Sequence, residues 1–215
     1  GAVGEVMLSI LAEHGFAAEN VVALASERSA GKPVDFGRHS LTVDDLDGFD
    51  FSGVKYALFS AGGSVSEKYA PLAAEAGAIV IDNTSAFRYI DDIPLVVPEV
   101  NPHRLEGVGP GAIIANPNCS TIQRLVALAP IHRAAGIDRI NVATYQSVSG
   151  AGATALRELV EQTVDRLNFR EPTLNKFVQP IAFNVLPQID TMQDNGYTRE
   201  EMKMVWETQK IFEDP

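Results

Sequence analysis

The sequence predicts an α/β protein whose first part is a parallel, doubly wound sheet. Short apolar runs at 21–25, 56–60 and 78–82 predict buried strands, and segments of helical periodicity separate them. This alternation is typical of strand–helix–strand crossovers, which place parallel strands in one sheet and helices on its faces. The rest of the chain holds longer helices and fewer strands, so we expect one domain at 1–115 and a second, α+β domain at 116–215.

Composition and charge narrow the class of protein. Hydrophobic residues make up 46% of the 215 residues, which is enough to build a core. The net charge of −11 argues against a surface for nucleic acid or anionic membranes. The single cysteine fits a reducing cytosol, and no apolar run approaches the ~18 residues of a membrane span. We expect a cytoplasmic protein without nucleic-acid or membrane partners and without a metal site.

The first four residues, Gly1-Ala2-Val3-Gly4, lead into an amphipathic helix that ends near Gly15. Spaced glycines at a helix start belong to the Rossmann dinucleotide-binding fingerprint, in which a strand and one more glycine come first. We therefore expect a Rossmann-type domain that lacks its first strand. A bare G-x-x-G is a weak signal, because any loop before a helix can carry it.

The strand predicted at 21–25 ends in a polar turn that bears on the choice of cofactor. In a dinucleotide site the tip of this second strand meets the adenosine ribose, where an acid suits NAD and an arginine suits the 2′-phosphate of NADP. Arg28 and Ser29, with Lys32 nearby, favour NADP, whereas Glu27 favours NAD unless its side chain points outward. The alternative is a polar surface turn without a ligand.

The second half of the chain is predicted from its alternation, breaks and caps. Residues 139–149 alternate like a half-buried strand and break at 150–152. Helices are expected at 154–168 and 199–209, the latter capped by Thr198.

The only cysteine lies in the stretch NPNCST at 116–121, between an apolar run and a segment of helical periodicity. Pro117 disfavours helix before the turn, so Cys119 is expected at or just before a helix N-terminus. The unpaired N–H groups and the dipole of a helix start favour the thiolate, and the same N–H groups can bind an oxyanion. Cys119 is thus a candidate nucleophile; the alternative is a buried, inert cysteine.

Five motifs together resemble the aspartate-β-semialdehyde dehydrogenase family, in its order and at its spacing, over essentially the whole chain. The motifs are GAVG at 1–4, SERSAG at 26–31, DNTSAFR at 82–88, NPNCST at 116–121 and QSVSGAG at 146–152. The resemblance implies the interconversion of L-aspartyl-4-phosphate and L-aspartate 4-semialdehyde with NADP(H) and phosphate, through an acyl thioester. This reaction feeds the synthesis of lysine, threonine, methionine and diaminopimelate. It also implies dimers, often paired into tetramers, built largely by the second domain.

The resemblance also assigns roles to individual residues. It implies that Cys119 carries the acyl group and that Gln146 positions the thioester. It implies that Arg88 and Asn118 bind phosphate, a task that suits a guanidinium fork. Glu200 and Lys203 resemble the pair that binds the substrate amino group and phosphate; the alternative is an exposed i,i+3 ion pair. The implied cofactor contacts are Gly1, Ala2, Val3, Gly4, Arg28, Ser29, Ser149 and Gly150.

The chain departs from the family in one respect. The family's acid/base histidine and its arginine for the substrate carboxylate would follow Pro215, and none of His14, His39, His103 and His132 matches a catalytic position. We therefore expect a fragment that lacks its first strand and roughly its last third, and that is inactive as residues 1–215 alone.

Three alternatives stay open. N-acetyl-γ-glutamyl-phosphate reductase performs the same chemistry on a longer acyl chain, but its nucleophile turn usually carries glycine where this chain has Asn118. Glyceraldehyde-phosphate dehydrogenase is less favoured, because its cysteine motif differs. A non-catalytic paralogue that binds nucleotide or a partner is disfavoured, because both Cys119 and Gln146 are present.

Overall fold

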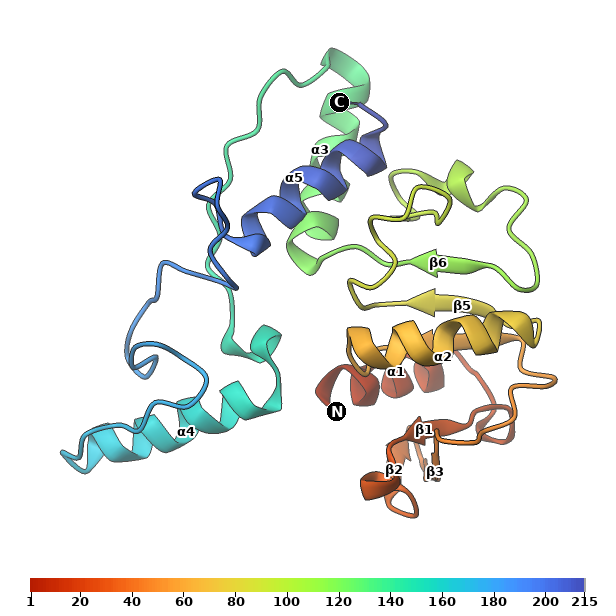
Figure 1. Cartoon of the computed structure of the whole chain (residues 1–215), viewed down its shortest axis with the longest axis horizontal. Helices are drawn as coiled ribbons and strands as arrows, with labels where there is room; N and C mark the ends of the chain where they lie inside the picture. The colour runs from red at the N-terminus through yellow and green to blue at the C-terminus, as the bar shows by residue number, and fades with distance from the viewer. Residues whose placement is uncertain (215) are drawn as a thin grey trace. The chain divides into compact units, whose positions relative to one another are not determined.

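The chain divides into two compact units in the computed structural model, which describes residues 1–214 apart from the side chain of Ala2. The first unit comprises Gly1–Pro130 and Trp206–Pro215, and the second comprises Ile131–Val205. Pro215, the last residue of the predicted second domain, lies outside the described residues. Figure 1 follows the elements along the chain by colour. None of the helices within residues 1–214 has both the length and the apolar character that a membrane span requires.

A three-stranded parallel sheet forms the centre of the first unit. Its strands are β4 (Tyr56–Phe59), β5 (Ile79–Asp82) and β6 (Ile113–Ala115), in the order β4-β5-β6. Helix α2 (Gly63–Glu75) connects the first two strands and contacts all three (Figure 1). The predicted α/β fold with a parallel sheet is therefore confirmed.

The strands at the N-terminal end form a second, mixed sheet of order β1-β3-β2. β1 (Ala23–Ala25) runs parallel to β3 (His39–Asp45), whereas β2 (Pro33–Phe36) pairs with β3 antiparallel. Gly37 has a φ of 59°, which suits the first central position of a two-residue hairpin turn. Helix α1 (Ala2–Glu13) packs against β2. The antiparallel hairpin is a local addition to the parallel arrangement that the sequence predicts.

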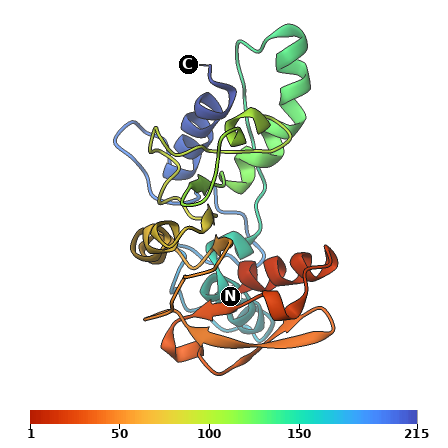
Figure 2. The same ribbon diagram turned by 90° about the vertical axis from the view of Figure 1, so that its right-hand side faces the viewer.

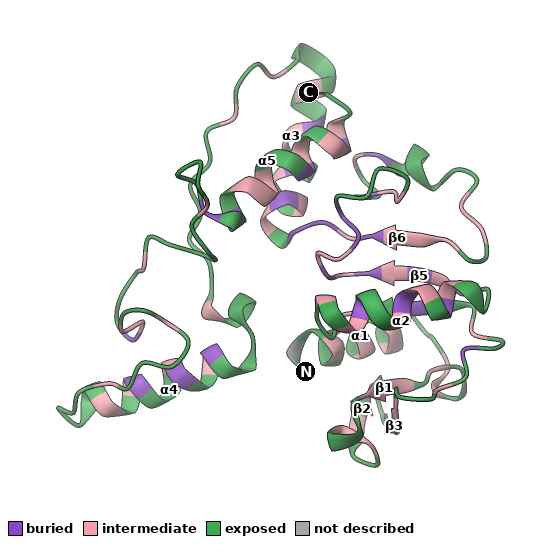
Figure 3. Ribbon diagram, viewed as in Figure 1, coloured by how far each residue is buried: buried purple, intermediate pink, exposed green. Residues whose placement is uncertain are grey.

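The core of the first unit lies between the parallel sheet and its helices. In β5 alternate residues are buried, and Val80 is fully enclosed. Figure 3 draws β5 and β6 in purple and pink, the colours of buried and half-buried residues. Ala70 and Ala73 of α2 are also fully buried, because small side chains let the helix lie close to the strands. Leu125 of α3 (Cys119–Ala135) is fully buried in the same core.

Helix α5 (Arg199–Phe212) closes the first unit with its C-terminal half. In Figures 1 and 2 this half lies beside α3, and the guanidinium of Arg124 donates a hydrogen bond to the hydroxyl of Thr208. The buried side chain of Ile211 joins the same hydrophobic core. The last turns of the chain therefore stabilise the element that begins with Cys119.

The second unit consists of helix and irregular chain. Its main elements are η4 (Val148–Ala151), α4 (Ala153–Leu167) and the first turns of α5. The strand predicted at 139–149 is wrong, since residues 141–147 are exposed and have no strand assignment. A strand needs a neighbour that accepts its backbone hydrogen bonds, and no described residue pairs with this segment.

The segment after α4 is held by Glu158, a buried carboxylate of that helix. Its Oε1 accepts a hydrogen bond from the N–H of Asn175 at 3.1 Å, and its Oε2 accepts one from the N–H of Lys176 at 2.5 Å. Glu158 has an exposed fraction of only 2%. A buried carboxylate is tolerated where several N–H groups donate to it, and here those groups come from one loop.

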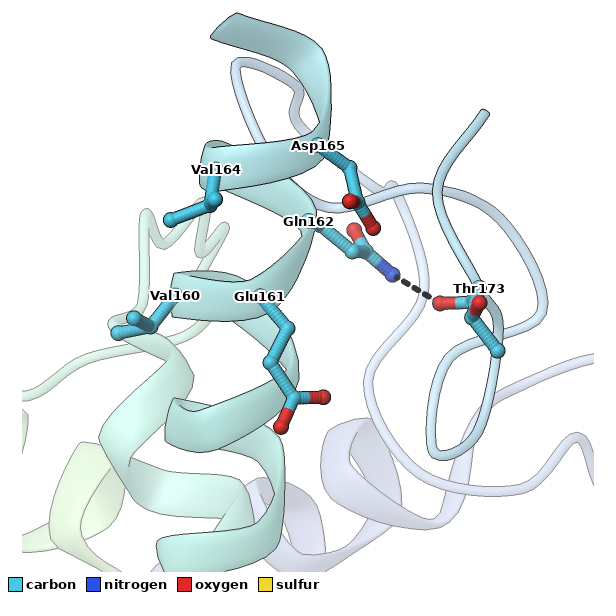
Figure 4. A pocket seen from close by; sticks show the side chains of 6 residues that line it. All are labelled: Val160, Glu161, Gln162, Val164, Asp165 and Thr173. Atoms are coloured by element: carbon cyan, nitrogen blue, oxygen red, sulfur yellow. Dashed lines mark hydrogen bonds between the residues drawn. The ribbon is translucent and has the colours of Figure 1, made fainter. Parts of the chain in front are cut away.

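Gln162, one turn further along α4, holds the same loop at two more points. Its Oε1 accepts a hydrogen bond from the N–H of Ile181 at 2.8 Å, and its Nε2 donates to the carbonyl of Thr173 at 3.2 Å (Figure 4). An open hollow lies beside this contact, lined by Val160, Glu161, Gln162, Val164, Asp165 and Thr173. The loop therefore takes its course from polar side chains rather than from a strand pair.

Candidate active site

Cys119 is the first residue of α3, and its side chain is exposed. The turn that precedes it begins where β6 ends, at the carboxyl edge of the parallel sheet. Asn118 caps the helix, because its Oδ1 accepts hydrogen bonds from the N–H groups of Ser120 at 2.9 Å and Thr121 at 3.4 Å. The predicted placement of Cys119 at a helix N-terminus is confirmed, and the alternative of a buried cysteine is wrong.

The backbone N–H groups around Cys119 are largely committed. The N–H of Asn118 donates to Oε2 of Glu207 at 2.7 Å, and those of Ser120 and Thr121 donate to the cap. Among the N–H groups of residues 118–121, that of Cys119 makes no hydrogen bond within the described residues. The sequence predicts several unpaired N–H groups at the start of this helix that could bind an oxyanion. Of the N–H groups of residues 118–121, only that of Cys119 is left for this role within the described residues.

Arg88 lies at the end of the loop that follows β5, and it is buried. Its Nη1 pairs with Oε1 of Glu207 at 3.0 Å, and its Nη2 donates to the carbonyl of Asn83 at 3.0 Å. The hydroxyl of Tyr89 donates to the same Glu207 oxygen at 3.2 Å. The structure thus brings two predicted site residues, Arg88 and Asn118, to one carboxylate that the sequence analysis did not single out.

The loop that carries Arg88 is shaped by Asp82, the buried last residue of β5. One carboxylate oxygen accepts a hydrogen bond from the hydroxyl of Ser66 at 2.7 Å, and the other accepts one from the hydroxyl of Thr84 at 2.7 Å. The side-chain amide of Asn116, which follows β6, donates to Oδ1 of Asn83 at 2.6 Å. The loops at the carboxyl ends of two neighbouring strands are therefore joined, which fixes the cysteine turn relative to Arg88.

Three other predicted residues meet in the second unit. Nζ of Lys203 donates to Oε2 of Glu200 at 3.0 Å and to Oδ2 of Asp190 at 2.8 Å, and Nε2 of Gln146 lies 3.5 Å from Oε1 of Glu200. Burial would lower the pKa of Lys203, but its bonds to the two carboxylates outweigh burial and raise it. Lys203 is therefore bound by two carboxylates, those of Glu200 and Asp190. The alternative of an exposed i,i+3 ion pair between Glu200 and Lys203 alone does not describe this arrangement.

Asp190 was missed by the sequence analysis. It has a φ of 67°, which few residues other than glycine adopt, and it lies in the irregular segment before α5. Burial would raise the pKa of Asp190, but hydrogen bonds from Lys203 and from the N–H of Thr191 lower it overall. No local signal marks such a residue, because its partner is a side chain from a helix that follows it.

The predicted cofactor residues of the first unit lie at two points. Gly1 caps α1, so that Val3 and Gly4 belong to its first turn rather than to a loop; Ala2 starts the helix, and its side chain lies outside the described residues. Arg28 and Ser29 lie in η2 (Glu27–Ser29), directly after β1, and Arg28 is exposed. Arg28 makes no hydrogen bond or ion pair within the described residues, and an arginine and a helix N-terminus are both features that suit a phosphate group.

The other two predicted cofactor residues, Ser149 and Gly150, lie in η4 of the second unit. The N–H of Ser149 donates to Oγ of Ser147 at 3.3 Å, and the two hydroxyls lie 3.0 Å apart. This short turn stands directly before α4. Its role in cofactor binding remains a prediction.

Two family models match the chain. The model for the NAD binding domain of semialdehyde dehydrogenase matches residues 1–108, and the model for the semialdehyde dehydrogenase dimerisation domain matches residues 128–215. Aspartate-semialdehyde dehydrogenase 2 from Vibrio cholerae is 60% identical over all of this chain, which covers 64% of that protein. Aspartate-semialdehyde dehydrogenase from Vibrio mimicus is 59% identical over all of this chain, which covers 68% of that protein.

A solved structure agrees with these relatives. The crystal structure of aspartate semialdehyde dehydrogenase II from Vibrio cholerae, complexed with ASA, matches with a TM-score of 0.94 and 59% identity. The match covers the whole of this chain and 64% of that one, so the chain spans less than two thirds of the length of these Vibrio cholerae proteins. The chain belongs to the aspartate-semialdehyde dehydrogenase family.

Proposed function

We propose that the full-length protein interconverts L-aspartyl-4-phosphate and L-aspartate 4-semialdehyde, with NADP(H) as cofactor and inorganic phosphate as the second product or substrate. The observation that carries the proposal is the placement of Cys119. It is an exposed thiol at the first position of a capped helix, and its own N–H makes no hydrogen bond within the described part of the chain. A thiolate in this setting is activated by the helix start and has a donor for the oxyanion that its attack creates.

The chemistry divides into two steps at Cys119. The thiolate attacks the acyl carbon, a carbon–sulfur bond forms, and the carbon–oxygen bond to phosphate breaks, so that phosphate leaves with the electron pair. When bound, NADPH supplies the hydride that reduces the thioester. The carbon–sulfur bond then breaks, the aldehyde forms, and Cys119 is again a thiolate. In the reverse direction, phosphate releases the acyl group from the cysteine.

The remaining site residues are proposed to bind the substrate. Arg88 offers a guanidinium to the phosphate group, and Asn118 holds the cysteine turn beside it. Lys203 and Glu200 supply the cation for phosphate and the carboxylate for the substrate amino group. Gln146 orients the thioester. The contact of Gln146 with Glu200, and of Glu200 with Lys203, supports a common task for these three side chains.

The cofactor is proposed to be NADP rather than NAD. The family model names an NAD binding domain and leaves this choice open. Arg28 is exposed at the end of β1, where a 2′-phosphate is read in folds of this kind. A Cβ placed on Gly4 would lie 3.9 Å from Oγ of Ser60, so the first turn of α1 lies next to the residue that follows β4. These features fit a dinucleotide across the carboxyl ends of the strands.

The wider assignments follow from the family and belong to the same proposal. The NADP-binding domain comprises residues 1–115 and the catalytic and dimerisation domain starts at residue 116. The protein acts in the cytoplasm as a dimer or a dimer of dimers. Its product feeds the synthesis of lysine, threonine, methionine and diaminopimelate.

The proposal is tested by nicotinamide absorbance with the full-length protein, aspartate semialdehyde and NADP, with and without phosphate. We expect a phosphate-dependent rise that falls at least ~1000-fold in Cys119→Ala, because the nucleophile is lost. Glu213→Gln, an exposed change outside the site, serves as the matched control. NAD in place of NADP should give a much slower rise. Undiminished activity in Cys119→Ala contradicts the mechanism, and faster turnover of N-acetyl-γ-glutamyl semialdehyde favours the rival substrate.

A further inference from the structure

Glu207 is a fully buried carboxylate that the proposed chemistry does not use. It lies on α5 with an exposed fraction of 0%. Oε1 accepts hydrogen bonds from Arg88 and Tyr89, and Oε2 accepts one from the N–H of Asn118 at 2.7 Å. Burying a charge is costly unless the group is paired and hydrogen-bonded, so each of these contacts offsets part of that cost. Glu207 carries the same sign of charge as the phosphate that Arg88 is proposed to bind, so its place beside Arg88 needs a physical explanation.

The contacts of Arg88 fix two of the three nitrogens of its guanidinium. Nη1 and Nη2 donate to Glu207 and to the carbonyl of Asn83, whereas the buried Nε has no hydrogen-bond partner among the residues that the structure describes. A guanidinium carries five N–H donors in a rigid plane. Two fixed points in that plane set its orientation.

The backbone near Arg88 is held separately from its side chain. Nζ of Lys210, on the turn of α5 after Glu207, donates to the carbonyl of Arg88 at 3.0 Å and to the carbonyl of Ile90 at 2.6 Å. Loss of the Glu207 carboxylate would therefore free the guanidinium and the Asn118 peptide while the loop stays attached to α5. This separation makes the role of the carboxylate testable.

We infer that Glu207 is the positioning residue of this site, which holds the Arg88 guanidinium and the peptide before Cys119 at one fixed spacing. The inference rests on the proposed function, in which Arg88 and Cys119 act on the two sides of the same acyl phosphate bond. Only a carboxylate offers an acceptor to both groups. A glutamine at this position has one oxygen and one NH₂ group. Its NH₂ would point either at the guanidinium of Arg88 or at the N–H of Asn118, so that two hydrogen-bond donors would face each other.

The first test is a kinetic comparison in the full-length protein. In Glu207→Gln we expect kcat to fall at least ~10-fold while KM for NADP stays within about twofold, because the cofactor residues are untouched. Glu213→Gln, whose carboxylate pairs with Arg104 at the end of the same helix, should match wild type. Combining Glu207→Gln with Arg88→Lys should cost little more than the worse single change. Additive losses, or a Glu207→Gln enzyme equal to the control, overturn the inference.

The second test does not require turnover. Alkylation of Cys119 by iodoacetamide is followed at pH 7 by mass spectrometry of the peptide that contains it. Glu207→Gln leaves Arg88 without its counter-ion close to the cysteine turn, so alkylation should accelerate by at least ~3-fold, whereas Arg88→Met should slow it. The slowing in Arg88→Met should be smaller than the acceleration in Glu207→Gln. In Arg88→Met the negative charge of Glu207 still interacts with the positive charge of Arg124, which offsets part of its effect on the thiol. Equal rates in wild type and both variants overturn the inference.

The two tests separate the inference from the proposed function. If wild type lacks dehydrogenase activity but the alkylation rates shift as expected, the proposed function fails and the position of Glu207 stands. If a single variant does not fold, Arg88→Met/Glu207→Met removes both charges with similar volume, an exchange that buried ion pairs often tolerate. That double variant, folded by circular dichroism and with wild-type kcat, overturns the inference.

Discussion

Asn118 shows how much one residue contributes to the geometry of the cysteine turn. Its side chain caps α3 through the N–H groups of Ser120 and Thr121, and its own N–H is fixed by Glu207. A cap of this kind contributes about 1 kcal/mol to helix stability. The side-chain oxygen of Asn118 is therefore committed to the backbone, and any contact with phosphate must come from its amide group.

Glu158 is the residue on which we expect the second unit to depend most. Glu158→Gln leaves one acceptor oxygen for N–H groups that now use two, so we expect a loss of about 2–3 kcal/mol in the free energy of unfolding. Thermal unfolding followed by circular dichroism should show a midpoint about 4–12 °C lower. Glu161→Gln, an exposed change on the same helix, is the control. Equal midpoints would show that the loop is held by other contacts.

The elements divide into those fixed by local signals and those fixed by distant partners. The N-terminus of α5 belongs to the first kind. Thr198 and Glu201 form a capping box, in which the Thr198 hydroxyl accepts the N–H of Glu201 at 3.2 Å and the Glu201 carboxylate accepts the N–H of Thr198 at 2.6 Å. This reciprocal pair explains why the start of α5 is readable from the sequence.

Removing the cap should destabilise α5 measurably. For Thr198→Ala we expect a loss of about 1 kcal/mol, because the N–H of Glu201 loses the hydroxyl that accepts it. Urea unfolding at pH 7 gives the free energy directly. Thr154→Ala, an exposed change in the first turn of α4, is the matched control and should lie within about 0.5 kcal/mol of wild type. A Thr198→Ala chain as stable as the control would contradict a role for the box.

The misjudged elements share one physical cause. Residues 139–149 have the alternation of a strand, yet alternation specifies two faces and cannot supply the neighbour that a strand must pair with. Glu207 has the opposite property: no local pattern marks it, yet it has partners. It contacts Asn118 and Arg88, which precede it by 89 and 119 positions in the chain. Cys119, by contrast, was placed correctly because Pro117 and Asn118 act on their own neighbours.

Charge is the property that acts on the molecule as a whole. The chain carries a net charge of −11, and several carboxylates are stabilised in the folded state. The pKa of Asp47 is lowered first by the hydroxyl of Tyr69 and then by Lys68, and that of Glu201 is lowered by the N–H and hydroxyl of Thr198. A folded-state pKa below the unfolded value adds stability above the unfolded pKa, and this stability disappears as the pH falls through the folded pKa.

The sign of this linkage gives a prediction for acid. The unfolded values are near 3.8 for Asp47 and 4.5 for Glu201, so the stability that these two carboxylates contribute should fall below about pH 4.5. Urea unfolding midpoints of wild type and Glu201→Gln should differ at pH 7, and the difference should shrink as the pH falls from 7 toward 3, because protonation of Glu201 removes the stability that its lowered pKa supplies. A difference that is the same at both pH values would contradict the linkage.

The exposed thiol of Cys119 is also the group of this chain that we expect peroxide to oxidise first. A thiolate that attacks acyl groups also reacts with peroxide, and the first product is a sulfenic acid. Proteins that sense peroxide reversibly place a second cysteine nearby to trap that acid as a disulfide. These 215 residues contain no second cysteine. Within them an oxidised Cys119 has only an external thiol to restore it, and further peroxide takes it to the irreversible sulfinic state.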